Sequence, residues 1–151
     1  MKALIIYDSV YGNTEKIAKA IGEAITPSNE VKVLRTGEAN PSDLEPLDLL
    51  IVGSPTHAGR PVSGIQDFLN KVPEVSIKGK KVAGFDTRTS SKFARIFGYA
   101  AGRIVRGLEK KGGIPAASPG GFFVTGTQGP LKEGELERAA AWAKGILEPK
   151  K

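Results

Sequence analysis

The stretch "KALIIYDSVYGNTEKIAKAI", residues 2–21, decides the fold of this chain. Its first part, residues 2–8, is a nearly continuous apolar run, as expected of a strand that is covered on both faces of a sheet. Gly12, Asn13 and Thr14 then suit a tight turn and the cap of a following helix. A buried strand that leads through a short loop into a helix predicts an α/β protein with a parallel sheet.

The rest of the chain continues this alternation. We expect further strands at residues 30–36, 47–54, 80–87 and 120–126. Helices are expected at 13–26, 62–72, 90–111 and 131–148, and only the crossover at 37–46 lacks a clear helix. Such alternation is typical of a parallel sheet joined by right-handed crossovers.

Two helices show which face should meet the core. In 90–111 the expected core positions are Phe93, Phe97, Ala100, Ala101, Ile104 and Leu108, and the expected cationic back is Lys92, Arg95, Arg103, Arg106 and Lys110. In 131–148 the expected core positions are Leu136, Ala139, Ala140, Ala143 and Leu147. Trp142 lies beside them and is expected to cover the sheet edge.

Composition narrows the possible functions. A length of 151 residues fits one compact domain, residues 1–151. There is no cysteine and one histidine, so we expect no disulfide, no thiolate site and no metal site. The apolar run at the N-terminus is too short for a signal sequence, and we expect a cytoplasmic protein with no membrane partner. The net charge of +6 favours acidic partners.

Loops rich in small and hydroxyl side chains follow three of the strands. A parallel α/β sheet binds ligands beyond the carboxyl ends of its strands, so "DSVYGNT" (8–14), "GSPTHAGRP" (53–61) and "FDTRTSS" (85–91) should border one crevice. The loop 8–14 matches neither the P-loop nor the G-x-G-x-x-G pattern. Taken alone it is either an ordinary helix cap or a phosphate cradle.

These loops together resemble those of the flavodoxin family. "SVYGNT" (9–14) is similar to the family's S/T-x-T-G-x-T phosphate loop, with Tyr11 where the family usually has threonine. "GSPTHAG" (53–59) and "DTR" (86–88) resemble the loops on the two sides of the flavin ring. The resemblance covers essentially the whole chain. It implies a three-layer α/β/α sandwich with a five-stranded parallel sheet of order 2-1-3-4-5, in the short-chain form.

The resemblance also implies a binding site for FMN. The residues carried over to that site are Ser9, Val10, Tyr11, Gly12, Asn13, Thr14, Pro55, Thr56, His57, Ala58, Gly59, Asp86, Thr87 and Arg88. His57 either stacks on the flavin or points to water, and Arg88 either faces the flavin or pairs with Asp86. The family's aromatic residue in the third loop could be Phe85 or Tyr99.

The function implied is non-covalent FMN binding and transfer of one or two electrons between redox partners. Flavodoxins are typically acidic, whereas this chain is at +6, which predicts a partner with an acidic docking surface. Two alternatives stay open: a flavin-dependent NAD(P)H- or quinone-type oxidoreductase, and a module that has lost FMN because of Tyr11.

Other protein classes fit the sequence poorly. A receiver domain needs a phosphorylatable aspartate after the third strand, where this chain has "GSPT". A phosphatase of this topology needs a cysteine, and a serine hydrolase would need the G-x-S-x-G pattern that is absent. The cationic back of 90–111 carries only Tyr99 among its charges and matches no nucleic-acid motif, so we expect no nucleic-acid partner.

Overall fold

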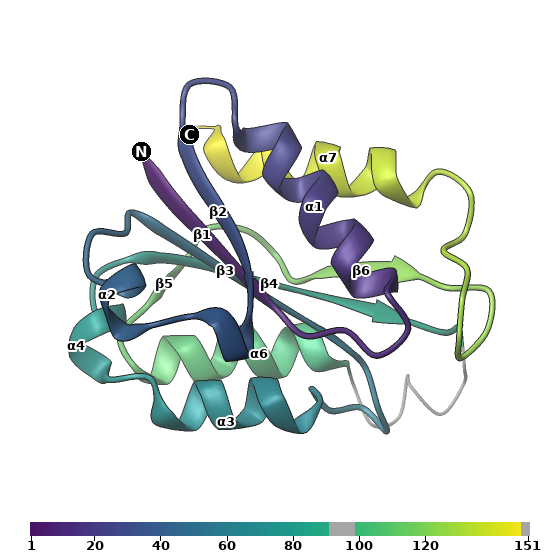
Figure 1. The fold of residues 1–151 in the computed structure, drawn as a ribbon, viewed down its shortest axis with the longest axis horizontal. Helices are drawn as coiled ribbons and strands as arrows, with labels where there is room; N and C mark the ends of the chain where they lie inside the picture. Colours follow the sequence, from purple (N-terminus) through teal and green to yellow (C-terminus); the bar gives the residue numbers. More distant parts are fainter. Residues whose placement is uncertain (91–98, 149–151) are drawn as a thin grey trace.

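A parallel sheet forms the centre of the computed structural model, which describes residues 1–90 and 99–148. Its strands are β1 (Lys2–Tyr7), β2 (Glu30–Arg35), β3 (Leu49–Pro55), β4 (Lys81–Arg88), β5 (Ile114–Pro115) and β6 (Gly120–Phe123). They lie in the order β2-β1-β3-β4-β5, β6 also pairs with β4, and every pairing is parallel (Figure 1). The predicted 2-1-3-4-5 order is confirmed.

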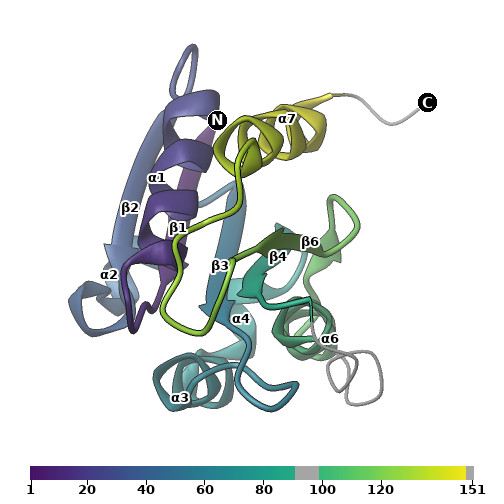
Figure 2. The ribbon, with the colours of Figure 1, turned by 90° about the vertical axis from the view of Figure 1, so that its right-hand side faces the viewer.

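Helices cover both faces of this sheet, as Figure 2 shows in end view. They are α1 (Asn13–Ile25), α2 (Pro41–Leu44), α3 (Ser63–Lys71), α4 (Glu74–Ile77), α6 (Ala100–Lys110) and α7 (Glu135–Leu147), with a 3-10 turn at Thr36–Glu38. The helices α1 and α7 lie on one face, and α3 and α6 lie on the other. The three-layer α/β/α sandwich is therefore confirmed.

The apolar run of β1 divides its side chains between two cores. Ala3, Ile5 and Tyr7 pack with the residues of α1 and α7, whereas Leu4 and Ile6 pack with those of α3 and α6. Successive side chains of a strand point to opposite faces, so a strand between two helical layers must be apolar at every position. This explains why the run has no polar alternation.

The fifth position of the sheet is interrupted. We predicted one strand at 120–126, but both β5 and β6 pair with β4, and their register to it shifts by two residues between Pro115 and Gly120. Pro115 and Pro119 flank the interruption, and proline has no N–H with which to continue a ladder. The strand order is unaffected, because both segments occupy the same edge.

Several helix predictions are confirmed and others are corrected. Residues 91–98, with Phe93 and Phe97, lie outside the described residues. The helix predicted at 90–111 is corrected, because α6 begins at Ala100 and Tyr99 before it is extended (φ −133°, ψ 154°). Leu136 is 43% exposed, and Glu135 is buried in its place because it binds Arg138 and the backbone of β6. The crossover at 37–46 holds the short α2, and the short α4 was not predicted. Trp142 does cover the sheet edge, over Gly120 of β6.

Among the helices of residues 1–90 and 99–148, none is long and apolar enough to cross a bilayer.

Candidate functional site

The loop between β1 and α1 presents a row of backbone N–H groups. Gly12 precedes the helix in a left-handed conformation (φ 90°), which turns the chain sharply. Its N–H donates to Ser9 Oγ (3.0 Å), and the Ser9 N–H donates to Asp8 Oδ1 (2.9 Å). Five backbone N–H groups have no acceptor among the described residues, those of Val10, Tyr11, Asn13, Thr14 and Glu15. Such a group of donors at a helix N-terminus can bind an anion.

Arg35, the last residue of the neighbouring strand β2, stabilises this loop through its guanidinium group. Its guanidinium donates to the Ser9 carbonyl oxygen (3.3 Å) and lies 3.6 Å from both Asp8 Oδ1 and Glu15 Oε2. Glu15 also accepts a hydrogen bond from the Tyr7 hydroxyl (2.8 Å). That bond lowers the pKa of Glu15, whereas burial and the same bond raise the pKa of Tyr7. Arg35 therefore lies between the two carboxylates beside the loop and holds them in place.

The second loop folds into a tight hairpin. The N–H and carbonyl groups of His57 and Arg60 are bonded to each other at 2.9 Å in both directions. Ala58 (φ 50°) and Gly59 (φ 79°) occupy the two central positions, as a type I′ turn requires. Thr56 ties the hairpin to β4, because its N–H donates to the Thr87 carbonyl oxygen (2.9 Å). The hairpin therefore projects beyond the carboxyl end of β3 while its base is fixed.

The third loop contains a buried ion pair. Asp86 is fully buried and accepts hydrogen bonds from Arg88 Nε (2.7 Å), Arg88 Nη2 (2.8 Å) and the Ala101 N–H (2.9 Å). The Arg88 guanidinium also lies 3.4 Å from the centre of the Tyr99 ring. Of the two roles open for Arg88, pairing with Asp86 is the one the structure contains. Arg88 nevertheless borders the cavity described next.

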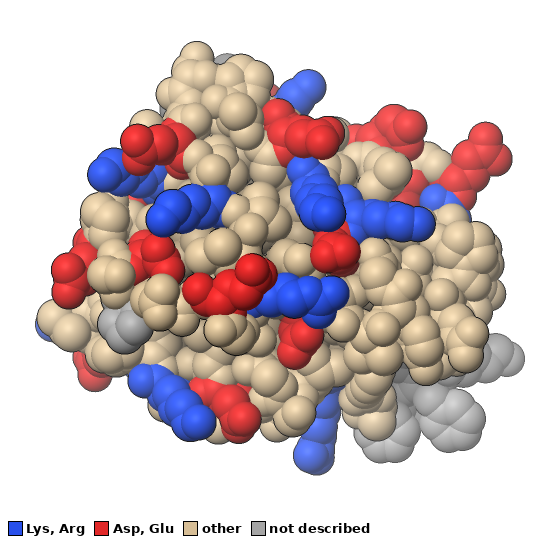
Figure 3. Space-filling view, in the orientation of Figure 1, with Lys and Arg blue, Asp and Glu red and all other residues tan. Residues whose placement is uncertain are grey.

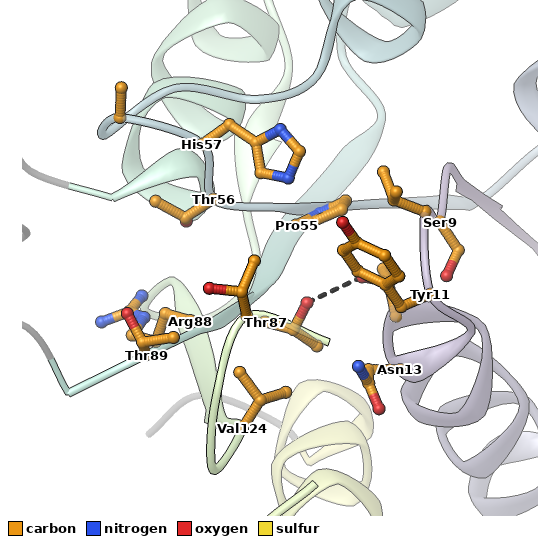
Figure 4. A pocket seen from close by; sticks show the side chains of 14 residues that line it. Ser9, Tyr11, Asn13, Pro55, Thr56, His57, Thr87, Arg88, Thr89 and Val124 are labelled. Atoms are coloured by element: carbon orange, nitrogen blue, oxygen red, sulfur yellow. Dashed lines mark hydrogen bonds between the residues drawn. The ribbon is translucent and has the colours of Figure 1, made fainter. Parts of the chain in front are cut away.

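One cavity of about 380 Å³ connects the three loops (Figure 4). It is lined by Ser9, Val10, Tyr11, Asn13, Thr14, Pro55, Thr56, His57, Ala58, Thr87, Arg88, Thr89, Val124 and Thr127. The hydroxyls of Thr14 and Thr87 are hydrogen-bonded at 2.8 Å and join the first loop to the third. A volume of this size lies in the range of roughly 300–1,000 Å³ that holds small ligands and cofactors.

Most of the predicted site residues line this cavity, and three do not. Gly12 and Gly59 shape the first two loops through their backbones, and Asp86 is buried behind the third. Phe85 packs in the core against Phe122 and Trp142, and Tyr99 covers Arg88, so neither candidate aromatic residue borders the cavity. Those aromatic assignments are not supported.

Tyr11 and His57 are the aromatic side chains that border the opening. Figure 4 shows the two rings on either side of Pro55, with the Tyr11 ring directed toward the cavity. The Tyr11 side chain is about half exposed, and its backbone N–H is one of the five donors without an acceptor among the described residues. A ligand in the cavity would therefore meet both the ring and the N–H of Tyr11.

The sequence analysis missed Thr89, Val124 and Thr127 as cavity residues. Thr89 extends the third loop by one residue, whereas Val124 and Thr127 follow β6. Ligands lie at the carboxyl ends of parallel strands, and this rule also applies to β6 at the fifth position of the sheet. Applied there, it would have predicted Val124 and Thr127 as cavity residues. Among the described residues, no group of three or more His, Cys, Asp or Glu side chains is placed to hold a metal ion.

Comparisons with known proteins place this geometry in a family. The sequence model of the family described as Flavodoxin matches residues 5–142. Flavodoxin 1 of Escherichia coli K12 is 32% identical over 109 residues, which are 72% of this chain and 61% of that protein. The flavodoxin of Synechocystis is 29% identical over 110 residues, 72% of this chain and 65% of that protein. The matched segment thus spans less than two thirds of each relative.

Solved structures of flavodoxins share the fold. A flavodoxin from the domain Archaea superposes with a TM-score of 0.82 at 23% identity, covering 97% of this chain and 96% of the other. Flavodoxin 1 of Bacillus cereus superposes with a TM-score of 0.78 at 22% identity, covering 97% of each chain. At these identities the likeness establishes the arrangement of strands and helices.

Proposed function

The chain belongs to the flavodoxin family, and from this premise we propose that it binds FMN in the cavity and carries electrons between redox proteins. The observation that carries the proposal is the row of five backbone N–H groups at one end of a cavity bordered by the His57 hairpin and Thr87. FMN, when bound, supplies one- and two-electron chemistry. The comparisons favour neither the NAD(P)H- or quinone-type oxidoreductase nor a module without FMN.

The residues of this chain fit a phosphate-bearing flavin. The five N–H groups and the hydroxyls of Ser9 and Thr14 would hold the phosphate, and no Lys or Arg lies within residues 9–14. Backbone dipoles and the helix N-terminus would stabilise the negative charge instead of a counter-ion. The Thr56–Gly59 hairpin and Thr87 would border the ring system, with His57 on one side.

Retention of FMN, compared with riboflavin, tests this assignment. The purified chain is mixed with either flavin and desalted, and the flavin absorbance that stays with the protein is measured. We expect about one FMN per chain and at least tenfold weaker binding of riboflavin, because riboflavin lacks the phosphate that the loop N–H groups would bind. Equal affinity for the two flavins would place the phosphate elsewhere.

The role as a carrier has its own test. The FMN-loaded chain should oxidise NAD(P)H only when a separate reductase is present, and should then pass electrons to an acceptor protein. Turnover of NAD(P)H with a quinone and no reductase would instead identify a stand-alone oxidoreductase. The net charge of +6 supports a partner with an acidic docking surface.

A further inference from the structure

A second groove lies between α3 and α6, on the face of the sheet opposite α1 and α7. The two helices run side by side there (Figure 2). The groove has a volume of about 430 Å³ and is lined by Arg60, Pro61, Gln66, Leu69, Asn70, Arg103, Arg106, Gly107, Lys110 and Lys111. We call it the α3–α6 groove.

The lining of the α3–α6 groove carries charge of one sign. Five of its described residues are Lys or Arg, and none is Asp or Glu. Lys111 donates to the backbone carbonyl oxygens of Asn70 and Val72, which leave its positive charge uncompensated. Arg60, Arg106 and Lys110 are exposed and form no ion pair with a described carboxylate. The described lining of the groove therefore carries a net positive charge, which favours a positive potential inside it.

Charge is distributed differently on the face that Figure 3 shows. There, acidic and basic side chains alternate over the surface, and no large area carries one sign alone. Ion pairs such as Lys32–Asp43 and Lys19–Glu15 join residues of α1, α2 and β2 in the same half of the molecule. The α3–α6 groove is thus a local concentration of positive charge and does not merely reflect the net charge of the chain.

The groove begins at the rim of the cofactor cavity. Arg60 lines the groove and closes the hairpin with His57, which lines the cavity. The first residue of α6, Ala100, donates its N–H to Thr56 Oγ1 (3.0 Å), and Thr56 also lines the cavity. A molecule seated in the groove would therefore lie against the hairpin that borders the cavity.

We infer that the α3–α6 groove is the docking site for an acidic electron-transfer protein, held against the His57–Arg60 hairpin. A cleft lined by one sign of charge steers an oppositely charged partner and orients it on contact. A nucleic acid is less well matched, because no described residue of the lining is aromatic and could stack on a base. The electron-transfer part of this inference rests on the proposed FMN function. The docking part does not, because binding of the partner can be measured without FMN.

Binding of an acidic haem protein provides the first test. Fluorescently labelled cytochrome b5, an acidic acceptor, is titrated with the full chain, with and without FMN, at about 20 mM and about 300 mM salt. The variant R106E/K110E changes two exposed groove residues, and the control K19E/K144E makes the same charge change on α1 and α7. We expect R106E/K110E to weaken low-salt binding at least tenfold and the control to weaken it less than threefold.

Electron transfer provides the second readout. FMN would supply the electrons: each ferric haem iron would take one and become ferrous, so two cytochromes would reoxidise one anionic reduced flavin, which would give up one proton to solvent. At low salt the rate with cytochrome b5 should fall about tenfold in R106E/K110E, whereas the rate with the basic cytochrome c should not fall. Flavin absorbance in the same samples reports whether FMN is bound, so a failure of cofactor binding is distinguished from a failure of docking.

Three results would overturn the inference. In the first, R106E/K110E and K19E/K144E weaken binding of cytochrome b5 equally, which would show that only the net charge of the chain matters. The second is binding of cytochrome b5 that does not respond to salt. In the third, R106E/K110E no longer binds a labelled 20-base oligonucleotide but still binds cytochrome b5 as the parent does. That result would make the groove a nucleic-acid site.

Discussion

At the scale of single residues, the backbone angle of Gly12 shapes the loop that presents the row of N–H groups. Its φ of 90° suits glycine, and a Cβ built there would meet no atom within 4 Å. A substitution at this position would therefore act through conformational strain and not through a steric clash. A residue with a side chain loses roughly 1–2 kcal/mol in the left-handed region.

We expect Gly12→Ala to weaken FMN binding about tenfold, because the loop would relax away from the geometry that aligns its N–H groups. The measurement is a titration of FMN fluorescence quenching. Gly37→Ala is the matched control, since a Cβ at Gly37 also has open space and its φ is not positive. If the two variants bind FMN equally well, the conformation of Gly12 does not contribute to the cradle.

Arg35 illustrates a residue that would act on a ligand without touching it. It offsets part of the negative charge of Asp8 and Glu15, which would otherwise repel the phosphate of FMN more strongly. We expect Arg35→Gln to raise the Kd for FMN roughly threefold to tenfold at low salt, and less at about 300 mM salt.

Two controls separate this charge effect from a loss of structure. Lys32→Gln removes the same charge from the same strand, where Lys32 pairs with Asp43, and should leave the Kd unchanged. Riboflavin has no phosphate, so its affinity should not respond to Arg35→Gln. A parallel loss of riboflavin affinity would contradict the electrostatic explanation.

At the scale of elements, the start of α7 is fastened to β6 by Glu135. Its buried carboxylate accepts hydrogen bonds from the Phe123 N–H (2.6 Å) and from Arg138 Nε (2.9 Å) and Nη2 (2.6 Å). Arg138 also donates to the Gly121 carbonyl oxygen of β6. These bonds position the strand that precedes the cavity residues Val124 and Thr127.

Replacing this carboxylate should cost stability. We expect Glu135→Gln to lower the free energy of unfolding by about 2 kcal/mol, since hydrogen bonds to charged groups contribute roughly 1.5–3 kcal/mol. Urea denaturation measures the change. Glu137→Gln, an exposed neighbour on the same helix, should change stability by less than about 0.5 kcal/mol. Similar losses in both variants would show that the bonds of Glu135 are not the cause.

The same residue predicts a pH dependence. The bonds from Arg138 hold the pKa of Glu135 below its usual value. A lowered pKa in the folded state contributes stability above the unfolded pKa of about 4.3, and that contribution is lost as the pH falls through the folded pKa. The stability difference between the parent and Glu135→Gln should therefore be full at pH 6 and shrink below pH 4. A constant difference across this range would exclude the linkage.

At the scale of the whole molecule, net charge should act on the bound cofactor. With +6, attraction should stabilise the reduced anionic FMN, so we predict a less negative potential for the second electron than acidic flavodoxins have. Arg88 contributes little to this effect, because Asp86 neutralises it at 2.7 Å. Arg60, exposed on the hairpin, is the cationic residue expected to contribute most.

Potentiometric titration tests this prediction. Arg60→Gln should shift the potential of the second electron negative by roughly 10–20 mV at low salt, the order of magnitude that Coulomb's law in water gives for two unit charges separated by roughly 10 Å. The control Lys144→Gln, on the opposite layer, should shift it less. An equally low potential in the parent and in acidic flavodoxins would refute the role of net charge.

Much of this architecture was predictable because local sequence determines it. Residues 3–7 and 49–52 are apolar at successive positions, which requires helices on both faces of the sheet. The carboxyl ends of parallel strands share one edge, so the loops at 9–14 and 55–59 had to meet there. The identity of β1 and β3 as buried strands and the placement of these two loops therefore followed from hydrophobic period and strand direction.

Tertiary structure alone decided which side chains became partners. The sequence left Arg88 with two roles, and only the folded chain pairs it with Asp86 and adds the bond from the start of α6 to Asp86. Local sequence also does not indicate that Phe85 turns into the core and leaves the cavity to Tyr11 and His57. The α3–α6 groove likewise joins residues of two helices that are separated in sequence by β4. Hydrophobic periodicity determines which face of each helix is exposed. Which other residues lie beside that face depends on how segments distant in sequence pack, and this is decided only in the folded chain.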